Sequence, residues 1–217
     1  MNVILFGPPG SGKGTQAKDV SGALGIPHVA TGDIFRRHLR EGTDLGKLAR
    51  SFMDRGELVP DSVTCDLVAS RLVEPDARDG VLLDGFPRSV PQAEWLVRWF
   101  GEHGRRFDAI LNLVVSDELV VERISGRRTC LKCGATYHVV YAPPPPAGCA
   151  HCAEGEVVQR KDDGEEVVRA RLETYHRETA PVLHVLRRAG VVHDIDAVGA
   201  IDVIRARLFA ALGLPPA

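Results

Sequence analysis

The sequence has no apolar run that approaches the roughly 20 residues needed to cross a bilayer, which argues against a membrane-spanning helix. It also lacks an excess of either charge, because 27 basic and 29 acidic residues leave a formal net charge of −2 at pH 7. No overall positive field therefore favours nucleic acid or an anionic membrane as a partner. The segment Met1–Phe6 contains no basic leader and runs directly into glycines, so we expect no signal peptide. These absences favour a cytoplasmic protein.

Lysine is scarce, with 5 lysines beside 22 arginines. We interpret this as a genome-wide coding bias, so the number of arginines alone marks no site.

The chain of 217 residues is long enough for one substantial core with a small insert. Its 44% hydrophobic and 26% charged residues are ordinary for a globular protein, and no internal repeat is visible.

Four of the five cysteines form two C-x-x-C pairs with 15 residues between them: Cys130 and Cys133, then Cys149 and Cys152. Without an export signal, this spacing favours a tetrahedral zinc site of four thiolates over disulfides. A redox role and a different soft metal remain as alternatives. His138 and His151 lie in the same segment, but four sulfurs already complete such a site. We expect Cys65 to be a small buried apolar residue.

Short apolar runs alternate with helical patterns along most of the chain. Four continuous runs predict buried parallel strands: Val3–Phe6, Val81–Leu83, Ile110–Val115 and Val191–Ile195. Helices are predicted over Gln16–Leu24, Asp61–Leu72, Pro91–Phe100, Asp117–Ile124 (with Asp117 as N-cap), Glu165–Arg188 and from Ile201 to Leu212. Pro181 should kink or split the longest of them. The alternation predicts a doubly wound α/β core with a parallel sheet.

Two stretches interrupt this alternation. From about Ala30 to Val59 the sequence is helical and charged, and from Arg127 to Asp163 it holds the four clustered cysteines. The second stretch has too little apolar content for a core of its own, and a bound zinc ion would supply the missing stabilisation. We therefore predict a core of residues 1–29, 60–126 and 164–217, a helical insert at 30–59 and a zinc-containing, β-rich insert at 127–163.

The strongest motif is Gly7–Thr15, which lies directly between a strand and a helix. Gly7, four residues and then Gly12-Lys13 form a P-loop, whose backbone N–H groups surround phosphate oxygens while the lysine supplies a mobile charge. Gly14 departs from the general pattern, in which Ser or Thr follows the lysine. The motif predicts a nucleotide-binding site.

A second cluster, Asp84–Arg88 with Gln92, follows the second predicted strand. An acidic residue at the carboxyl end of a buried strand points to the ligand crevice of an open α/β sheet. Asp84 could therefore hold magnesium directly or through water, or it could merely cap the next turn.

These motifs occur in the order and spacing of the adenylate kinase family, which the chain resembles from Met1 to about Leu212. The matching segments are Gly7–Ala17, Thr31–Asp33, Asp84–Arg88 with Gln92, Gly126–Arg128, Arg160–Asp163 and Arg169–Arg171. The chain looks like the long-lid form, whose lid carries a structural zinc in many bacterial members. The resemblance implies a monomer that catalyses ATP + AMP ⇌ 2 ADP with magnesium.

The resemblance also implies roles for individual residues. Those implied to bind ATP are Gly10, Ser11, Gly12, Lys13, Gly14, Thr15, Arg127, Thr136, Tyr137 and Gly199. Those implied to bind AMP are Thr31, Arg36, the backbone of Glu57, Leu58 and Val59, then Gly85, Phe86, Pro87, Arg88, Gln92, Arg160 and Arg171. Groups implied to act on the transferring phosphoryl group are Lys13, Asp84, Arg88, Arg123, Arg127, Arg160 and Arg171. Arg88 would hold the AMP phosphate and Gln92 the base. The surroundings of Gly199 differ from the commoner family sequence.

Physical reasoning agrees with these implied roles. Two polyanionic substrates require many fixed positive charges, and arginine binds phosphate in bidentate fashion without losing its charge. We see no catalytic triad or obvious general base, and in-line phosphoryl transfer by positioning and electrostatics needs none. Asp162 and Asp163 would pair with lid arginines, or form an exposed acidic pair. Alternatives are a relative that uses another monophosphate or GTP, and a P-loop switch that reads nucleic acid with a zinc ribbon.

Overall fold

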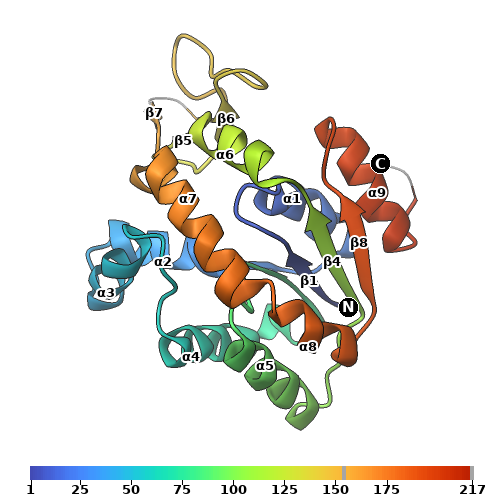
Figure 1. The fold of residues 1–217 in the computed structure, drawn as a ribbon. Coiled ribbons are helices and arrows are strands. Elements are labelled where there is room, and N and C mark those ends of the chain that lie inside the picture. Colours follow the sequence, from blue (N-terminus) through green and yellow to red (C-terminus); the bar gives the residue numbers. More distant parts are fainter. Residues whose placement is uncertain (153–154, 216–217) are drawn as a thin grey trace.

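The computed structural model describes residues 1–152 and 155–215 and contains a five-stranded parallel sheet in the order β2-β3-β1-β4-β8 (Figure 1). Its strands are β1 (Asn2–Phe6), β2 (His28–Ala30), β3 (Val81–Asp84), β4 (Ala109–Val114) and β8 (Val192–Asp196). The neighbouring strands are all parallel, so their carboxyl ends share one edge of the sheet. Residues 153–154 and 216–217, within the predicted lid and core ranges, lie outside the described residues.

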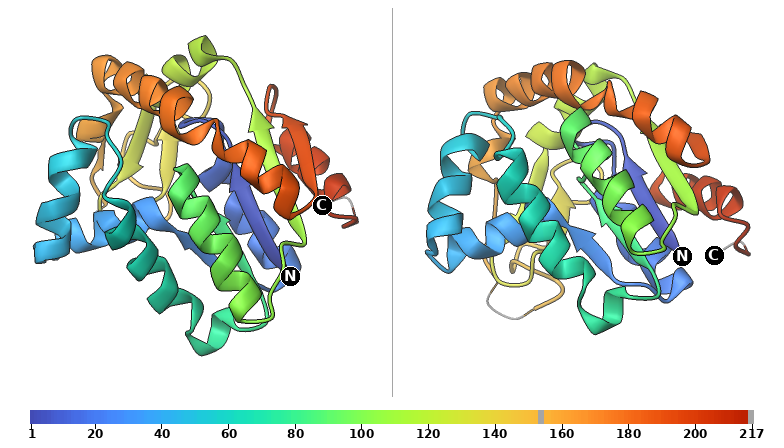
Figure 2. Two further views of the ribbon diagram at one scale, coloured as in Figure 1. Left: turned by 60° about the horizontal axis from the view of Figure 1, so that its bottom comes forward. Right: turned by 90° about the horizontal axis from the view of Figure 1, so that it is seen from below.

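Helices cover both faces of this sheet (Figures 1 and 2). The bounds are α1 (Lys13–Leu24), α4 (Asp61–Leu72), α5 (Val90–Glu102), α6 (Asp117–Ser125), α7 (Glu165–Thr174), α8 (Val182–Ala189) and α9 (Ile201–Ala211), with a 3-10 turn η1 (Pro75–Ala77). Ile4 and Phe6 of β1 pack with α4, α5 and α8, whereas Val3 and Leu5 pack with α1 and α9. This arrangement confirms the doubly wound α/β core. None of the described helices is long and apolar enough to span a bilayer.

Two helices, α2 (Thr31–Arg40) and α3 (Asp44–Met53), follow β2 and pack on each other. They share a small core of Phe35, Ala49 and Val59. A Cβ at Gly46 would lie 2.3 Å from the carbonyl oxygen of His38, so the close packing of the two helices requires glycine there. The sequence between β2 and α4 is therefore helical, as predicted.

A separate antiparallel sheet, in the order β6-β5-β7, follows α6 and stands off the central sheet (Figure 1). Its strands are β5 (Arg127–Cys130), β6 (Thr136–His138) and β7 (Val157–Val158), and a 3-10 turn η2 (Lys161–Asp163) leads to α7. Among the described residues of this segment, the buried side chains are Thr129, Cys130, Tyr137 and Asp163, none of them aliphatic. This β-rich segment agrees with the fold predicted from the cysteines; the predicted domain limits stay a prediction.

Three local features differ from the predicted elements. Strand β2 was not predicted, because it has three residues with only Val29 buried and lies at the sheet edge. The N-cap of α6 is Ser116 rather than Asp117, since Ser116 Oγ accepts from the Leu119 amide. The long helix is split before α8, as predicted from Pro181, but the split passes through a π-helical turn, η3 (Tyr175–Thr179), that the sequence did not predict.

Candidate active site

The loop between β1 and α1 curls back on itself at the carboxyl edge of the central sheet. Gly7, Gly10 and Gly12 have φ angles of 133°, 73° and 99°, which residues with side chains rarely adopt. A Cβ at Gly10 would also lie 2.7 Å from a side-chain carbon of Ile124 in α6. The turn leads into the amino end of α1, where backbone N–H groups and the helix dipole favour an anion.

Lys13, the first residue of α1, lies against the backbone of this loop. Its Nζ donates to the carbonyl oxygens of Gly7 and Pro8 at 2.8 and 2.7 Å. Burial lowers the pKa of the Lys13 amine to about 8, and the Asp84 carboxylate opposes the shift. Three nearby guanidinium groups lower this pKa further: those of Arg88, Arg171 and Arg127. The structure thus brings Lys13, Asp84 and three predicted phosphate-binding arginines into one electrostatic environment.

Asp84 ends β3 and faces the start of α1. Its Oδ2 lies 3.2 Å from His28 Nε2 on the neighbouring strand β2, and a Cβ at Gly14 would be 3.7 Å from the same oxygen. The carboxylate, whose side chain is 12% exposed, offers an oxygen of the kind that magnesium prefers. The contact with His28 was not predicted, because the three-residue strand that carries it gave no recognisable pattern.

The segment after β3 folds Arg88 back over Gly85. Arg88 Nε donates to the Gly85 carbonyl oxygen at 2.6 Å, and Thr31 Oγ1, at the start of α2, donates to the same oxygen at 2.8 Å. Gly85 has a φ of 70°, and a Cβ there would lie 2.5 Å from the Arg88 guanidinium. Thr179 Oγ1 of η3 donates to the Arg88 carbonyl oxygen at 2.6 Å, a support for Arg88 that the sequence did not reveal. Burial holds the pKa of Arg88 below its ordinary value.

Gln92, in the first turn of α5, is 2% exposed, and both ends of its amide are bonded. Oε1 accepts from the Arg88 backbone N–H at 2.8 Å, and Nε2 donates to Asp61 Oδ1 at 2.7 Å. Ser89 Oγ, at the N-cap of α5, donates to the same Asp61 oxygen at 2.8 Å. Neither Asp61 nor Ser89 was predicted, because each sits at a helix start, where capping explains such residues equally well.

A cavity of about 310 Å³ lies beside these residues. Its walls come from the segment 57–61, from Ser89 and from the α7–η3 helical run. The predicted residues Glu57, Leu58 and Val59 line it, next to Asp61. The volume falls at the lower end of the roughly 300–1,000 Å³ typical of small-molecule sites.

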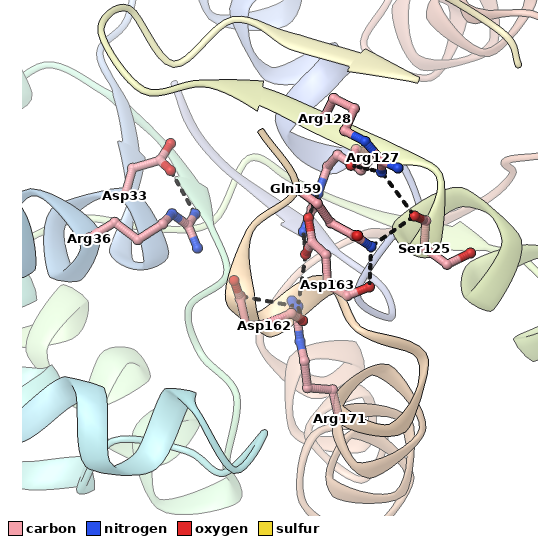
Figure 3. Close-up of polar contacts among 9 residues, drawn as sticks. All are labelled: Asp33, Arg36, Ser125, Arg127, Arg128, Gln159, Asp162, Asp163 and Arg171. Carbon is pink, nitrogen blue, oxygen red and sulfur yellow. Dashed lines mark hydrogen bonds and ion pairs between the residues drawn. The ribbon is translucent and has the colours of Figure 1, made fainter. Parts of the chain in front are cut away.

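Arginines from the small sheet and α7 meet two acidic residues of η2 (Figure 3). Arg127 bonds Asp163 through two guanidinium nitrogens, and Arg171 Nη1 lies 3.3 Å from Asp162 Oδ2. The side chain of Asp163 is fully buried. This confirms that Asp162 and Asp163 pair with arginines and do not form an exposed acidic pair. Against the effect of burial, Arg171 holds the pKa of Asp162 below its usual value. Burial lowers the pKa of Arg171 itself to about 10.

The helical insert contributes a further charged pair facing this cluster. Arg36 Nη2 donates to Asp33 Oδ1 at 2.6 Å within α2 (Figure 3). Burial, followed by the charges of Arg36 and Arg127, lowers the pKa of Arg160 to about 10. Arg123 of α6 instead donates to the carbonyl oxygen of Ala197, which follows β8, at 2.9 Å. Arginines from α2, from β5, from the residue before η2 and from α7 therefore affect one another electrostatically. Such a concentration of positive charge favours a polyanionic ligand.

The four clustered cysteines form a candidate metal centre. Their sulfur atoms all lie within 4.8 Å of one another: Cys130, Cys133, Cys149 and Cys152. Two of the Sγ–Sγ distances are 3.6 and 3.5 Å, close to the roughly 3.8 Å that separates ligands around a tetrahedral zinc with 2.3 Å bonds. The donor set and its spacing therefore fit zinc. The described part of the chain places neither His138 nor His151 in this group.

Tyr137 connects the small sheet to the metal centre. Its hydroxyl lies 3.3 Å from Cys149 Sγ and accepts from the Ala150 amide at 2.7 Å. Hydrogen bonding from Tyr137 is the main cause that lowers the pKa of Cys149, to about 6. Thr136 precedes it on the same strand, and Gly199 lies in the loop between β8 and α9 with a φ of 123°. Their predicted contacts with ATP stay a prediction.

Comparison with known proteins gives one consistent result. The family model described as adenylate kinase matches residues 5–191. An adenylate kinase of Acidothermus cellulolyticus is 48% identical over 212 residues, covering 98% of each chain. Adenylate kinases of Moorella thermoacetica and Symbiobacterium thermophilum are 47% and 50% identical, over 98% and 95% of each chain respectively.

Proposed function

This chain belongs to the adenylate kinase family and is a nucleoside monophosphate kinase that interconverts ATP + AMP and two ADP, and we propose that the site described above performs the transfer. The observation that supports this placement most strongly is that the guanidinium charges of Arg88, Arg127 and Arg171 and the Asp84 carboxylate all act on the Lys13 amine. Phosphoryl transfer between two nucleotides needs such a set of fixed positive groups.

On the ATP side, we assign the residues from Gly10 to Thr15 to the triphosphate. The positive φ angles of the loop leave its amide groups available to phosphate oxygens. When ATP binds, Lys13 Nζ would give up its hydrogen bonds to the Gly7 and Pro8 carbonyl oxygens and bind the phosphate that is transferred. Magnesium enters with ATP as part of the substrate, and the Asp84 carboxylate would hold it or its waters. When bound, the ion neutralises charge that develops on the phosphates.

On the AMP side, we assign Arg88 and Arg36 to the phosphate and Gln92 to the base. Thr31 and Gly85 support this position through the shared hydrogen bonds at the Gly85 carbonyl oxygen. The cavity beside Glu57, Leu58 and Val59 would admit the adenine ring. Arg123, Arg127, Arg160 and Arg171 then surround both sets of phosphates: they orient the substrates and exclude water when the small sheet closes.

The zinc that the four cysteines fit has a structural task in this scheme. All four ligands are protein sulfurs, so a bound ion keeps no open position for water or substrate. It would hold together a segment in which the buried side chains of the described residues include no aliphatic one. In agreement with its family, we propose that the enzyme acts as a cytoplasmic monomer on ATP, AMP and ADP, with no nucleic-acid or membrane partner.

A coupled assay of ADP formation with ATP and each of AMP, UMP, CMP and GMP tests the activity. We expect AMP to be the preferred acceptor by its kcat/KM. A comparable rate with a pyrimidine monophosphate, or no ADP formation with any of the four, would contradict the assignment. Single-stranded RNA at moderate salt should not bind.

A further inference from the structure

We propose that Asp61 is a specificity-determining residue that fixes the side-chain amide of Gln92 in one orientation and so selects a 6-aminopurine over a 6-oxopurine nucleoside monophosphate. The inference rests on the role proposed above for Gln92 at the base of AMP. Asp61 acts through Gln92, so it is a positioning residue.

The two partners of the Gln92 amide allow only one orientation. The Asp61 oxygen accepts hydrogen bonds from Gln92 Nε2 and Ser89 Oγ, and the Arg88 backbone N–H can only donate one. Turning the amide by 180° about its last side-chain bond would set Oε1 against the carboxylate and Nε2 against the N–H. Both bonds would then be lost in a side chain that is 2% exposed, where unsatisfied polar groups are costly.

Each partner is itself held by a third group. Asp61 Oδ1 also accepts from Ser89 Oγ at 2.8 Å, and the carboxylate lies at the amino end of α4, where an anion is favoured. The peptide of Arg88 is anchored through its carbonyl oxygen, which accepts from Thr179 Oγ1 at 2.6 Å. The amide is therefore oriented by two elements, α4 and η3, that lie outside the Arg88–Gln92 segment.

The two bonds to Asp61 and the Arg88 amide leave one N–H and one oxygen lone pair of the Gln92 amide for the base. A 6-aminopurine presents a donor amino group beside the acceptor N1, whereas a 6-oxopurine presents an acceptor oxygen beside a donor N1–H. An amide fixed in one direction pairs with only one of these two orders when the cavity holds the ring in one position. Asp61 and Ser89 also line the cavity next to Val59, so the network borders the space proposed for the base.

The test compares kcat/KM for AMP and for IMP, a 6-oxopurine monophosphate, with ATP saturating. Asp61→Asn keeps the shape of the side chain but can present a donor, and Asp61→Leu removes the acceptor. We expect the AMP/IMP ratio to fall about tenfold in Asp61→Leu and less in Asp61→Asn, mainly through KM for AMP, with KM for ATP unchanged. Asp66→Asn removes an exposed carboxylate from the same helix and should leave the ratio unchanged.

The same substitutions in a Gln92→Leu background show whether the effect passes through the amide. Gln92→Leu should itself lower the ratio, and Asp61→Asn should then change it no further. An unchanged ratio in Gln92→Leu would overturn the proposed base pocket and this inference with it. If the AMP/IMP ratio falls in Gln92→Leu but equals the parent value in both Asp61 variants, this inference alone is overturned. The same holds if Asp61→Asn changes the ratio equally in the parent and in the Gln92→Leu background. Melting temperatures identify any variant that does not fold, and Asp61→Asn, which preserves volume, carries the test if Asp61→Leu fails.

Discussion

Lys13 combines a position inside the phosphate-binding loop with a charge that the protein partly suppresses. Lys13→Met keeps the length of the side chain and deletes the charge. Because the amine would stabilise charge on the transferred phosphoryl group, we expect turnover to fall roughly 100-fold or more, about 3 kcal/mol in the barrier. Steady-state kinetics measure this, and circular dichroism should show an unchanged fold. Turnover above a tenth of the parent value would contradict the role.

The lowered pKa of Lys13 also predicts how stability depends on pH. Its value of about 8 in the folded protein lies below the ordinary 10.5, so between these values the unfolded chain holds a proton that the folded chain has released. The contribution of Lys13 to stability therefore becomes more favourable as pH rises through this window. Lys13→Met lacks this contribution. The difference in melting temperature, Lys13→Met minus parent, should therefore be more positive at pH 7 than at pH 10. A constant difference would show that Lys13 titrates normally.

Individual residues differ in how well the sequence predicts them. The pairs of Arg127 with Asp163 and of Arg171 with Asp162 follow from a charged motif and are present. The contacts of His28 with Asp84 and of Asp61 with Gln92 join residues 56 and 31 positions apart. Asp84 and Gln92 belong to a recognisable motif, but their partners His28 and Asp61 do not. A side chain whose role is to orient another carries no local signal, since only the folded chain brings the two together.

The cysteine-bearing segment shows how one element can depend on four side chains. Cys149→Ser leaves three thiolates and removes the sulfur that contacts Tyr137, so we expect weaker zinc retention and a lower melting temperature. Because the ion has no open position, turnover measured well below the melting point should largely persist. Metal content, melting temperature and turnover on the same sample decide this. If the variant melts at the parent temperature but has lost all phosphoryl transfer, the metal takes part in catalysis and the structural role is wrong.

Among the elements, apolar periodicity predicted the strands and helices that build the core. Their observed ends differ by a few residues at most, as in α4, which covers the predicted Asp61–Leu72. Periodicity failed at β2, which is too short for a pattern, and at η3, where a π turn replaces regular helix. In η3 the change comes from hydrogen bonding forced by Pro181 and is useful, because it places Thr179 against the backbone of Arg88.

At the scale of the whole molecule, the α2–α3 pair and the small sheet both extend from the edge where the parallel strands end (Figures 1 and 2). The like charge of Arg36, on α2, acts on Arg160, which lies between β7 and η2, and polyanionic substrates would remove that repulsion. A mimic of both substrates, two adenosines joined by five phosphates, should therefore protect amides near Thr136 and Tyr137 from hydrogen exchange. Exchange that is unchanged with saturating mimic would contradict closure.

Arg127 and Arg171 are each paired with a carboxylate of the protein, as the fixed charges of an ion-exchange resin are paired with counter-ions. Each arginine already has a counter-ion, so an arriving phosphate must displace or share it, and multivalent anions should do this far better than chloride. Tripolyphosphate at millimolar concentration should raise the melting temperature, whereas sodium chloride at matched ionic strength should not. An equal effect of the two salts would mean that general screening, rather than exchange at these arginines, controls the charge of the centre.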